Sequence, residues 1–231
     1  MKIGIIGAGQ IGGSLTRRLT ALGHEVFVAN SRGPETLSEL AEETGATPVS
    51  VTEAARSGEV VVVTIPQNRI PSLPAGLFAE LPHSVVIVDT GNYYPQQRDG
   101  RIDGIENGTP ESEWVEQQLS RPVVKAFNNI FAQDLLEFGR PAGIVDRIAL
   151  PIAGNDNAAK TVVLRLIDEL GFDGVDAGAL DESWRQQPGT PVYTTDLDAH
   201  GVRRALSQAS RDRKPEWRAT ANSPGTFANP A

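Results

Sequence analysis

The sequence predicts an α/β protein with a doubly wound, mainly parallel sheet and helices on both faces. Short apolar segments rich in β-branched residues alternate with helical patterns along most of the chain. Residues 60–65 and 85–88 are continuously apolar, as in parallel strands that are covered on both faces. A glycine-rich turn, residues 7–12, separates the first strand pattern from the first helical pattern. Together these observations indicate a fold of the Rossmann type.

In the first half of the chain, the first helical pattern follows the glycine turn and ends at Gly23, a suitable C-cap. Pro34 suits the first position of a second helix. Ser50 and Glu53 have the spacing of a capping box, which predicts a brief third helix. The strands are therefore expected at residues 2–6, 25–29, 47–49, 60–65 and 85–88, and the helices up to about residue 22 and at 34–44, 50–55 and 75–81.

The second half begins with a polar, glycine-rich stretch, residues 93–108, which is predicted to be a long functional or mobile loop. Val162, Leu166 and Leu170 lie on one side of a strongly amphipathic helical pattern that ends at Gly171. Further helices are expected at residues 109–119, 132–138 and 196–209, and strands at 122–127, 148–153 and 174–177.

These elements form one predicted domain, residues 1–210 of the 231-residue chain. Its last part, about residues 178–210, is expected to extend over the cleft at the edge of the sheet. Residues 211–231 are polar and contain proline, so they are predicted to form a flexible tail.

The composition argues against several kinds of partner. The net charge is −8 and no basic stripe is present, so nucleic acid is not an expected partner. No apolar run has membrane-spanning length, and no secretory leader pattern precedes the first strand. The absence of cysteine excludes disulfides and fits a reducing compartment. We therefore expect a cytoplasmic protein with a small-molecule partner, and the sequence is compatible with a homodimer.

Gly7, Gly9 and Gly12 form a G-x-G-x-x-G turn within a strand–turn–helix–strand unit. Gly7 allows the tight turn, Gly9 lets the backbone approach a pyrophosphate, and Gly12 lets the helix pack close to the strand. The phosphates would meet the helix N-terminus near Gln10 and Ile11. A glycine turn without a ligand is the alternative, but this context predicts a dinucleotide-binding site.

The second strand ends in Asn30, Ser31 and Arg32. NAD-binding proteins usually have Asp or Glu at this place, bound to the ribose hydroxyls. A carboxylate would repel a 2′-phosphate, whereas arginine offers a bidentate, permanently charged donor. The segment therefore predicts NADP(H), with an ordinary surface arginine as the alternative.

Four more polar clusters follow predicted strands, namely residues 64–66, 89–92, 127–129 and 154–156. Ligands of doubly wound sheets bind at the carboxyl ends of the strands. The clusters should therefore surround the nicotinamide, and we expect two of the four to contact cofactor or substrate. Whether Lys125, which lies deeper in its strand, faces the site stays open.

No Ser/His/Asp arrangement and no metal-ligand cluster is evident, so the sequence predicts neither a catalytic side chain nor a metal. His24 and His83 precede strands and should lie at the amino-terminal edge, away from the chemistry. Hydride transfer between two bound cofactors needs little from protein side chains. Residues 182–191, with Trp184, could form a wall of the substrate pocket or pack the last helix onto the sheet.

Residues 7–13, 30–35, 124–128 and 176–178 resemble the NADPH-dependent coenzyme F420 reductase family. This family includes many bacterial dinucleotide-binding proteins and is similar to the reductase domain of the STEAP metalloreductases. The resemblance extends from Lys2 to about Leu206. It implies a Rossmann-type domain that binds NADP(H) and passes hydride to or from a flavin or deazaflavin.

By position within this resemblance, Ser31 and Arg32 match the family's contacts to the 2′-phosphate. Thr64, Ile65 and Pro66 match the strand end beside the ribose and the nicotinamide. The resemblance thus implies NADP(H) as cofactor and F420 or a flavin as the second redox partner.

The sequence therefore predicts an NADP(H)-dependent oxidoreductase that exchanges hydride with a flavin or an F420-like deazaflavin. Two alternatives stay open. One is a non-catalytic NADP(H)-binding redox sensor that docks a partner protein. The other is an NADP-linked dehydrogenase of a small hydroxyacid or imine, which would normally carry a further helical domain. The predicted cofactor-binding residues are Gly7, Ala8, Gly9, Gln10, Ile11, Gly12, Asn30, Ser31, Arg32, Thr64, Ile65, Pro66, Asn92, Ala126 and Asn128.

Overall fold

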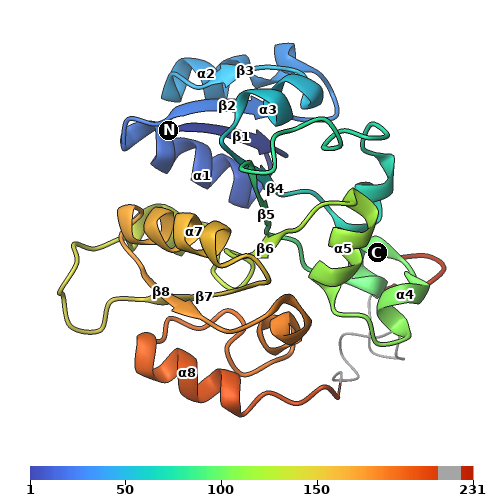
Figure 1. Ribbon diagram of the computed structural model, residues 1–231, viewed down its shortest axis with the longest axis vertical. Helices are drawn as coiled ribbons and strands as arrows, with labels where there is room; N and C mark the ends of the chain where they lie inside the picture. Colours follow the sequence, from blue (N-terminus) through green and yellow to red (C-terminus); the bar gives the residue numbers. More distant parts are fainter. Residues whose placement is uncertain (213–224, 231) are drawn as a thin grey trace.

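The computed structural model describes residues 1–212 and 225–230 (Figure 1). Within these residues one sheet has the strand order β3-β2-β1-β4-β5-β6-β7-β8. The strands are β1 (Lys2–Ile6), β2 (Glu25–Ala29), β3 (Thr47–Pro48), β4 (Val60–Val63), β5 (Val86–Asp89), β6 (Val124–Lys125), β7 (Ala149–Gly154) and β8 (Asp173–Asp176). The α-helices are α1 (Gln10–Ala21), α2 (Ser38–Thr44), α3 (Val51–Ser57), α4 (Asp103–Glu106), α5 (Glu111–Leu119), α6 (Ala132–Glu137), α7 (Asn157–Glu169) and α8 (Ala199–Ser207).

The predicted fold class is confirmed. Strands β1 to β6 pair in parallel, and the order reverses between β1 and β4, as in a doubly wound sheet. The sheet is only mainly parallel, because β7 pairs antiparallel with β6 and β8 follows the direction of β7.

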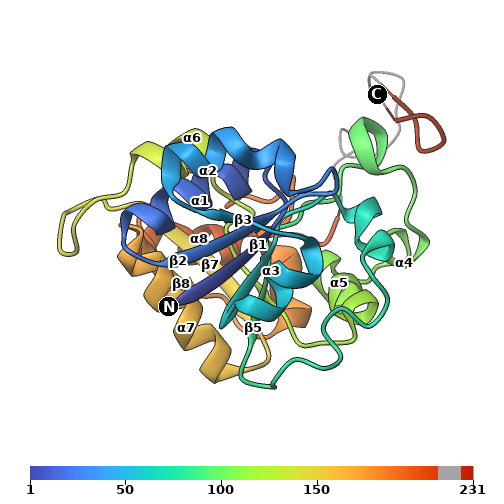
Figure 2. The same ribbon diagram turned by 90° about the horizontal axis from the view of Figure 1, so that it is seen from above.

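Alternate residues of the central strands enter two separate cores. Val60 and Val62 face the core that α1, α6 and α7 cover, whereas Val61 and Val63 face the core beneath α3 and α5. Figure 2 shows α1, α2 and α6 beside one another, with α3 and α5 on the other side. This burial on both faces explains the continuous apolar runs, because neither face of such a strand meets water.

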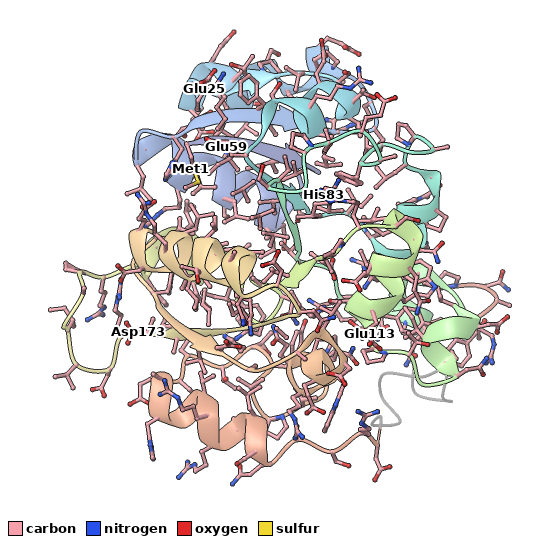
Figure 3. All side chains as sticks on the ribbon, in the orientation of Figure 1. Met1, Glu25, Glu59, His83, Glu113 and Asp173 are labelled. Atoms are coloured by element: carbon pink, nitrogen blue, oxygen red, sulfur yellow. The ribbon has the colours of Figure 1, made fainter. Side chains whose placement is uncertain are left out.

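The prediction for residues 154–156 is wrong. Because β7 runs antiparallel to β6, Gly154 pairs with Val124 at the beginning of β6. Asp156 lines a cavity of about 290 Å³ together with His83, at the amino-terminal ends of β5 and β6. Figure 3 labels His83 as well as Met1, Glu25 and Glu59, which mark the amino-terminal ends of β1, β2 and β4. Residues 154–156 therefore lie on the side of the sheet away from the glycine turn.

Two local predictions also differ from the structure. Residues 75–81 form successive turns rather than a helix, because Pro74 and Gly76 interrupt the segment; the helical residues lie earlier, in the 3₁₀ segment η2 (Gln67–Ser72). The stretch 93–108 is not one open loop, since it contains the π-helical turn η3 (Pro95–Asp99) and the helix α4. Most of the predicted tail, residues 213–224 and 231, lies outside the described residues.

Candidate cofactor and acceptor site

The glycine turn has the geometry that the motif requires. Gly7 has a φ of 113°, and a Cβ there would lie 2.2 Å from the carbonyl oxygen of Thr64. A Cβ on Gly12 would lie 1.9 Å from the carbonyl oxygen of Gly7, so α1 packs against the turn only without a side chain. A Cβ on Gly9 would meet nothing within 4 Å. Packing within the protein therefore explains Gly7 and Gly12, while the open approach at Gly9 suits a ligand.

The N-terminus of α1 fits an anionic group. Its N-cap is Gly9, which provides no capping side chain, and its first turn has no acidic residue. The first N–H groups of a helix lack partners within the helix and carry partial positive charge. The backbone thus offers donors for a phosphate at this point.

The end of β2 is shaped by Asn30. Its Oδ1 accepts the N–H of Arg32 at 2.8 Å, and its Nδ2 donates to Thr36 Oγ1 at 2.8 Å. Ser31 and Arg32 are exposed. Asn30 therefore holds the turn from which the Arg32 side chain projects.

The α1–α2 cavity has a volume of about 800 Å³ and lies among α1, α2, Arg32 and the start of α6. Arg17 and Arg32 are its lining cations. Arg17 donates two hydrogen bonds of 2.6 Å to Glu43, and these bonds lower the pKa of Glu43. For Arg32 the described part of the chain shows no ion pair. Arg32 is therefore the cation of this cavity that remains available for a phosphate.

The strand-end cavity, of about 470 Å³, lies at the carboxyl ends of β4, β5 and β6. Its polar and apolar lining includes the predicted Ile11, Thr64, Ile65, Pro66, Asn92 and Asn128. Gly9, Gln10, Phe131 and Ala132 line both this cavity and the α1–α2 cavity. The two cavities therefore meet at a neck beside the N-terminus of α1, which suits two nucleotide halves joined by a pyrophosphate.

Five of the predicted cofactor-binding residues line neither cavity. Gly7 and Gly12 shape the turn, and Asn30 shapes the end of β2, as described above. Ser31 is exposed beside Arg32. Ala126 is fully buried, and its N–H donates to the carbonyl of Asp89. The remaining predicted residues line one cavity or both, with Ala8 in the α1–α2 cavity.

Asn92 and Asn128 fix each other at the floor of the strand-end cavity. Asn92 Nδ2 donates to the carbonyl of Asn128 at 2.8 Å, and Asn128 Nδ2 donates to Asn92 Oδ1 at 3.0 Å. Gln186 Nε2 donates to Asn128 Oδ1 at 2.9 Å. These bonds join the loop after β5, the loop after β6 and the segment η4 (Leu180–Gln186). Such a connected network gives the floor of the cavity a single geometry.

Lys125 does not face the cavity. Its side chain is fully buried, and Nζ donates to the carbonyl of Gly91 at 2.8 Å. The carboxylates of Asp89 and Glu111 lie 3.7 and 4.0 Å from Nζ, and Ser112 donates to Asp89 at 2.6 Å. The hydrogen bond from Lys125 to Gly91 thus helps to hold the loop that carries Gly91 and Asn92 in place.

The outer wall of the strand-end cavity consists of side chains that are not among the predicted cofactor-binding residues. Tyr94, Arg98, Tyr193 and Thr194 line it. The hydroxyls of Tyr94 and Tyr193 hydrogen-bond to each other, and the Arg98 guanidinium lies 5.1 Å from the centre of the Tyr94 ring. Trp184, in contrast, lines a separate cavity of about 200 Å³. The part of residues 178–210 that reaches the cavity is therefore 193–194, and no spacing in the sequence marks it.

Burial raises the pKa of both Tyr94 and Tyr193. Above about pH 10 the unfolded chain therefore loses phenolic protons that the folded protein retains, so the free energy of unfolding should fall as the pH rises. We expect this alkaline decline to be smaller in the Tyr94→Phe/Tyr193→Phe double variant. Urea unfolding between about pH 8 and about pH 11 measures it. Equal pH slopes for the two proteins would contradict the assignment.

Among the described residues, no cluster of His, Cys, Asp and Glu could hold a metal ion. No helix in residues 1–212 or 225–230 is long and apolar enough to span a membrane.

The comparisons with known proteins agree with this geometry. The family described as "NADP oxidoreductase coenzyme F420-dependent" matches residues 2–93. The crystal structure of the hypothetical protein SMa0349 from Sinorhizobium meliloti is 31% identical, with a TM-score of 0.72, over 85% of this chain and 95% of that one. A structure from Arthrobacter sp. FB24, described as a candidate F420-dependent NADP reductase, is 26% identical, with a TM-score of 0.64, over 79% of this chain and 87% of that one.

A curated protein also matches the chain. YjhV of Escherichia coli (strain K12) is 43% identical over 71 residues, which are 31% of this chain. The match spans 52% of YjhV, so the chain corresponds to about half of the length of that relative.

The fold, the glycine turn and the matched residues define an NADP-binding, Rossmann-type protein of the oxidoreductase class. Within that class, the chain belongs to the coenzyme F420-dependent NADP oxidoreductase family.

Proposed function

We propose that the protein transfers hydride between NADP(H) and a flavin or an F420-like deazaflavin. The observation that carries this proposal is the pair of cavities joined at the neck. One cavity offers Arg32 to a 2′-phosphate, and the other opens at the strand ends between polar loops and an aromatic wall. NADP(H) would occupy both, with its pyrophosphate at the N-terminus of α1.

The predicted cofactor-binding residues take distinct roles in this proposal. The turn from Gly7 to Gly12 would hold the pyrophosphate, and Ser31 and Arg32 would hold the 2′-phosphate. Residues 64–66 would hold the nicotinamide ribose, while Asn92 and Asn128 would keep the floor beneath the ring in place. When bound, the reduced nicotinamide supplies the hydride.

The lining of the strand-end cavity supports a second cofactor as the acceptor. Its ionisable lining residues in the described chain are Tyr94, Arg98 and Tyr193, so it contains no His, Asp, Glu or Lys that could act as a general base near neutral pH. A ring that accepts hydride directly needs orientation and exclusion of water rather than such a base. Tyr94, Tyr193 and Phe131 provide aromatic surface of the kind that planar rings stack on.

Turnover with a panel of acceptors tests this proposal. NADPH oxidation should be measured with F420, FMN, FAD and ferric chelates at equal concentrations. We expect turnover with F420 or a flavin, and a lower rate with the chelates because they cannot accept hydride. NADPH binding without turnover across the panel would overturn the proposed reaction and favour a redox sensor that docks a partner protein. NADPH oxidation by a small imine or oxoacid, with no turnover for any member of this panel, would favour a dehydrogenase.

A further inference from the structure

The neck between the two cavities contains an exposed aromatic side chain. Its four residues come from two helices: Gly9 and Gln10 from the beginning of α1, and Phe131 and Ala132 from the beginning of α6. Phe131 is 57% exposed. Ligand pockets are lined largely by apolar and aromatic side chains, so a ring that lines both cavities is placed to contact a ligand that spans them.

The backbone that carries Phe131 is fixed relative to α1. The carbonyl of Phe131 accepts the N–H of Leu135 at 2.9 Å, so Phe131 is part of the first turn of α6. Ser14 Oγ donates to the carbonyl of Ala132 at 3.0 Å, and Arg18 donates to the carbonyl of Leu136 at 3.0 Å. Both donors lie on α1. These bonds tie the backbone of Phe131 to the helix that would hold the phosphates.

We infer that Phe131 covers the pyrophosphate of the bound dinucleotide and shields it from solvent. This inference rests on the proposed binding of NADP(H) across both cavities. The ring borders the neck where the uncapped N-terminus of α1 offers its N–H donors. Excluding water from that place lowers the local dielectric constant, which strengthens the attraction between the helix N-terminus and a phosphate. The apolar ring also gains contact with the riboses on either side of the pyrophosphate.

The Phe131 ring would contact the pyrophosphate, which NADPH and NADH share. Its removal should therefore weaken both dinucleotides by the same factor. Because the cover is added after the ligand has entered, its removal should mainly speed dissociation. It should also make binding more sensitive to salt, since phosphate contacts that are exposed to water are screened more strongly.

The test compares Phe131→Ala with Phe138→Ala, which removes an exposed phenylalanine (43% exposed) at the other end of α6, outside both cavities. We expect Phe131→Ala to weaken NADPH and NADH about tenfold each, through faster dissociation. Phe138→Ala should bind both as the parent protein does. Calorimetry gives the affinities, and stopped-flow displacement gives the dissociation rates. Equal thermal unfolding of the variants establishes that both are folded.

Two results would overturn the inference. One is an affinity of Phe131→Ala equal to that of the parent protein, and the other is a loss that affects NADPH alone. Failure of the proposed dinucleotide site is distinguishable from either, because the parent protein itself would then bind neither NADPH nor NADH, whereas failure of the proposed reaction alone would appear as binding without turnover. Without a dinucleotide site, Phe131→Ala and the parent protein would both give no binding signal.

Discussion

Replacing Arg32 with alanine is expected to weaken NADPH binding about 10- to 100-fold and to leave NADH binding unchanged. Arg32 projects from the turn after β2 into the α1–α2 cavity, where the other lining cation, Arg17, is already paired with Glu43. A charge-assisted hydrogen bond contributes about 1.5–3 kcal/mol, which corresponds to this range of affinity. NADH has no 2′-phosphate and should not sense the change. Calorimetry with each dinucleotide measures both affinities.

Arg56→Ala is the matched control for Arg32→Ala. Arg56 is an exposed arginine on α3 that lies 3.8 Å from Glu80 and lines neither cavity. The Arg56→Ala substitution changes the net charge by the same amount as Arg32→Ala. Any general electrostatic effect on an anionic ligand therefore appears in both variants. A parent protein that binds NADPH and NADH equally well, or an Arg32→Ala variant that keeps its preference, would contradict the role of Arg32.

Replacing Lys125 with methionine is expected to lower the free energy of unfolding by about 3–5 kcal/mol. The substitution leaves the carboxylates of Asp89 and Glu111, which are 1% and 2% exposed, without their buried cation. It also removes the hydrogen bond that supports Gly91. A domain of this size is stable by only about 5–15 kcal/mol, so the effect is a large part of the total. Urea unfolding at neutral pH measures it.

A charge-free version of the same cluster separates lost charge pairing from lost packing. The Asp89→Asn/Glu111→Gln/Lys125→Met variant removes all three charges of this cluster, so we expect it to be more stable than Lys125→Met alone. If the single variant were as stable as the parent protein, or the triple variant less stable than the single one, the account of this cluster would be wrong.

Much of the fold follows from local patterns in the sequence. The continuous apolar runs and the glycine turn predicted the parallel, doubly wound sheet, because burial on both faces and the turn geometry each leave a local signature. The ends of β4, β5 and β6 were placed correctly at one edge for the same reason. The position of residues 154–156 was not predictable, since the direction of β7 depends on its pairing with β6 rather than on its own residues.

The individual side chains that form the outer wall of the strand-end cavity could not be predicted either. Tyr94 and Tyr193 are 99 residues apart, and only the folded chain brings their hydroxyls together. Phe131 lies two residues after the cluster 127–129, which the sequence did associate with the site, yet no local pattern shows that an aromatic side chain there is exposed. Secondary-structure patterns predict which residues lie at the strand ends. Contacts between residues far apart in the sequence decide which side chains face those ends.

The antiparallel direction of β7 has a consequence for where in the sequence the lining residues of the two cavities lie. Because the carboxyl ends of β7 and β8 lie away from the strand-end cavity, part of its outer wall comes from Tyr193 and Thr194, far downstream of Tyr94 and Arg98, which form the rest. Under the proposed function, changes at residues 193–194 would alter the part of the acceptor site that they form without altering the residues that line the α1–α2 cavity. Recombination between relatives near residue 178 would therefore exchange this part of the wall and keep Tyr94, Arg98 and the α1–α2 cavity, which offers a route by which such a scaffold diversifies.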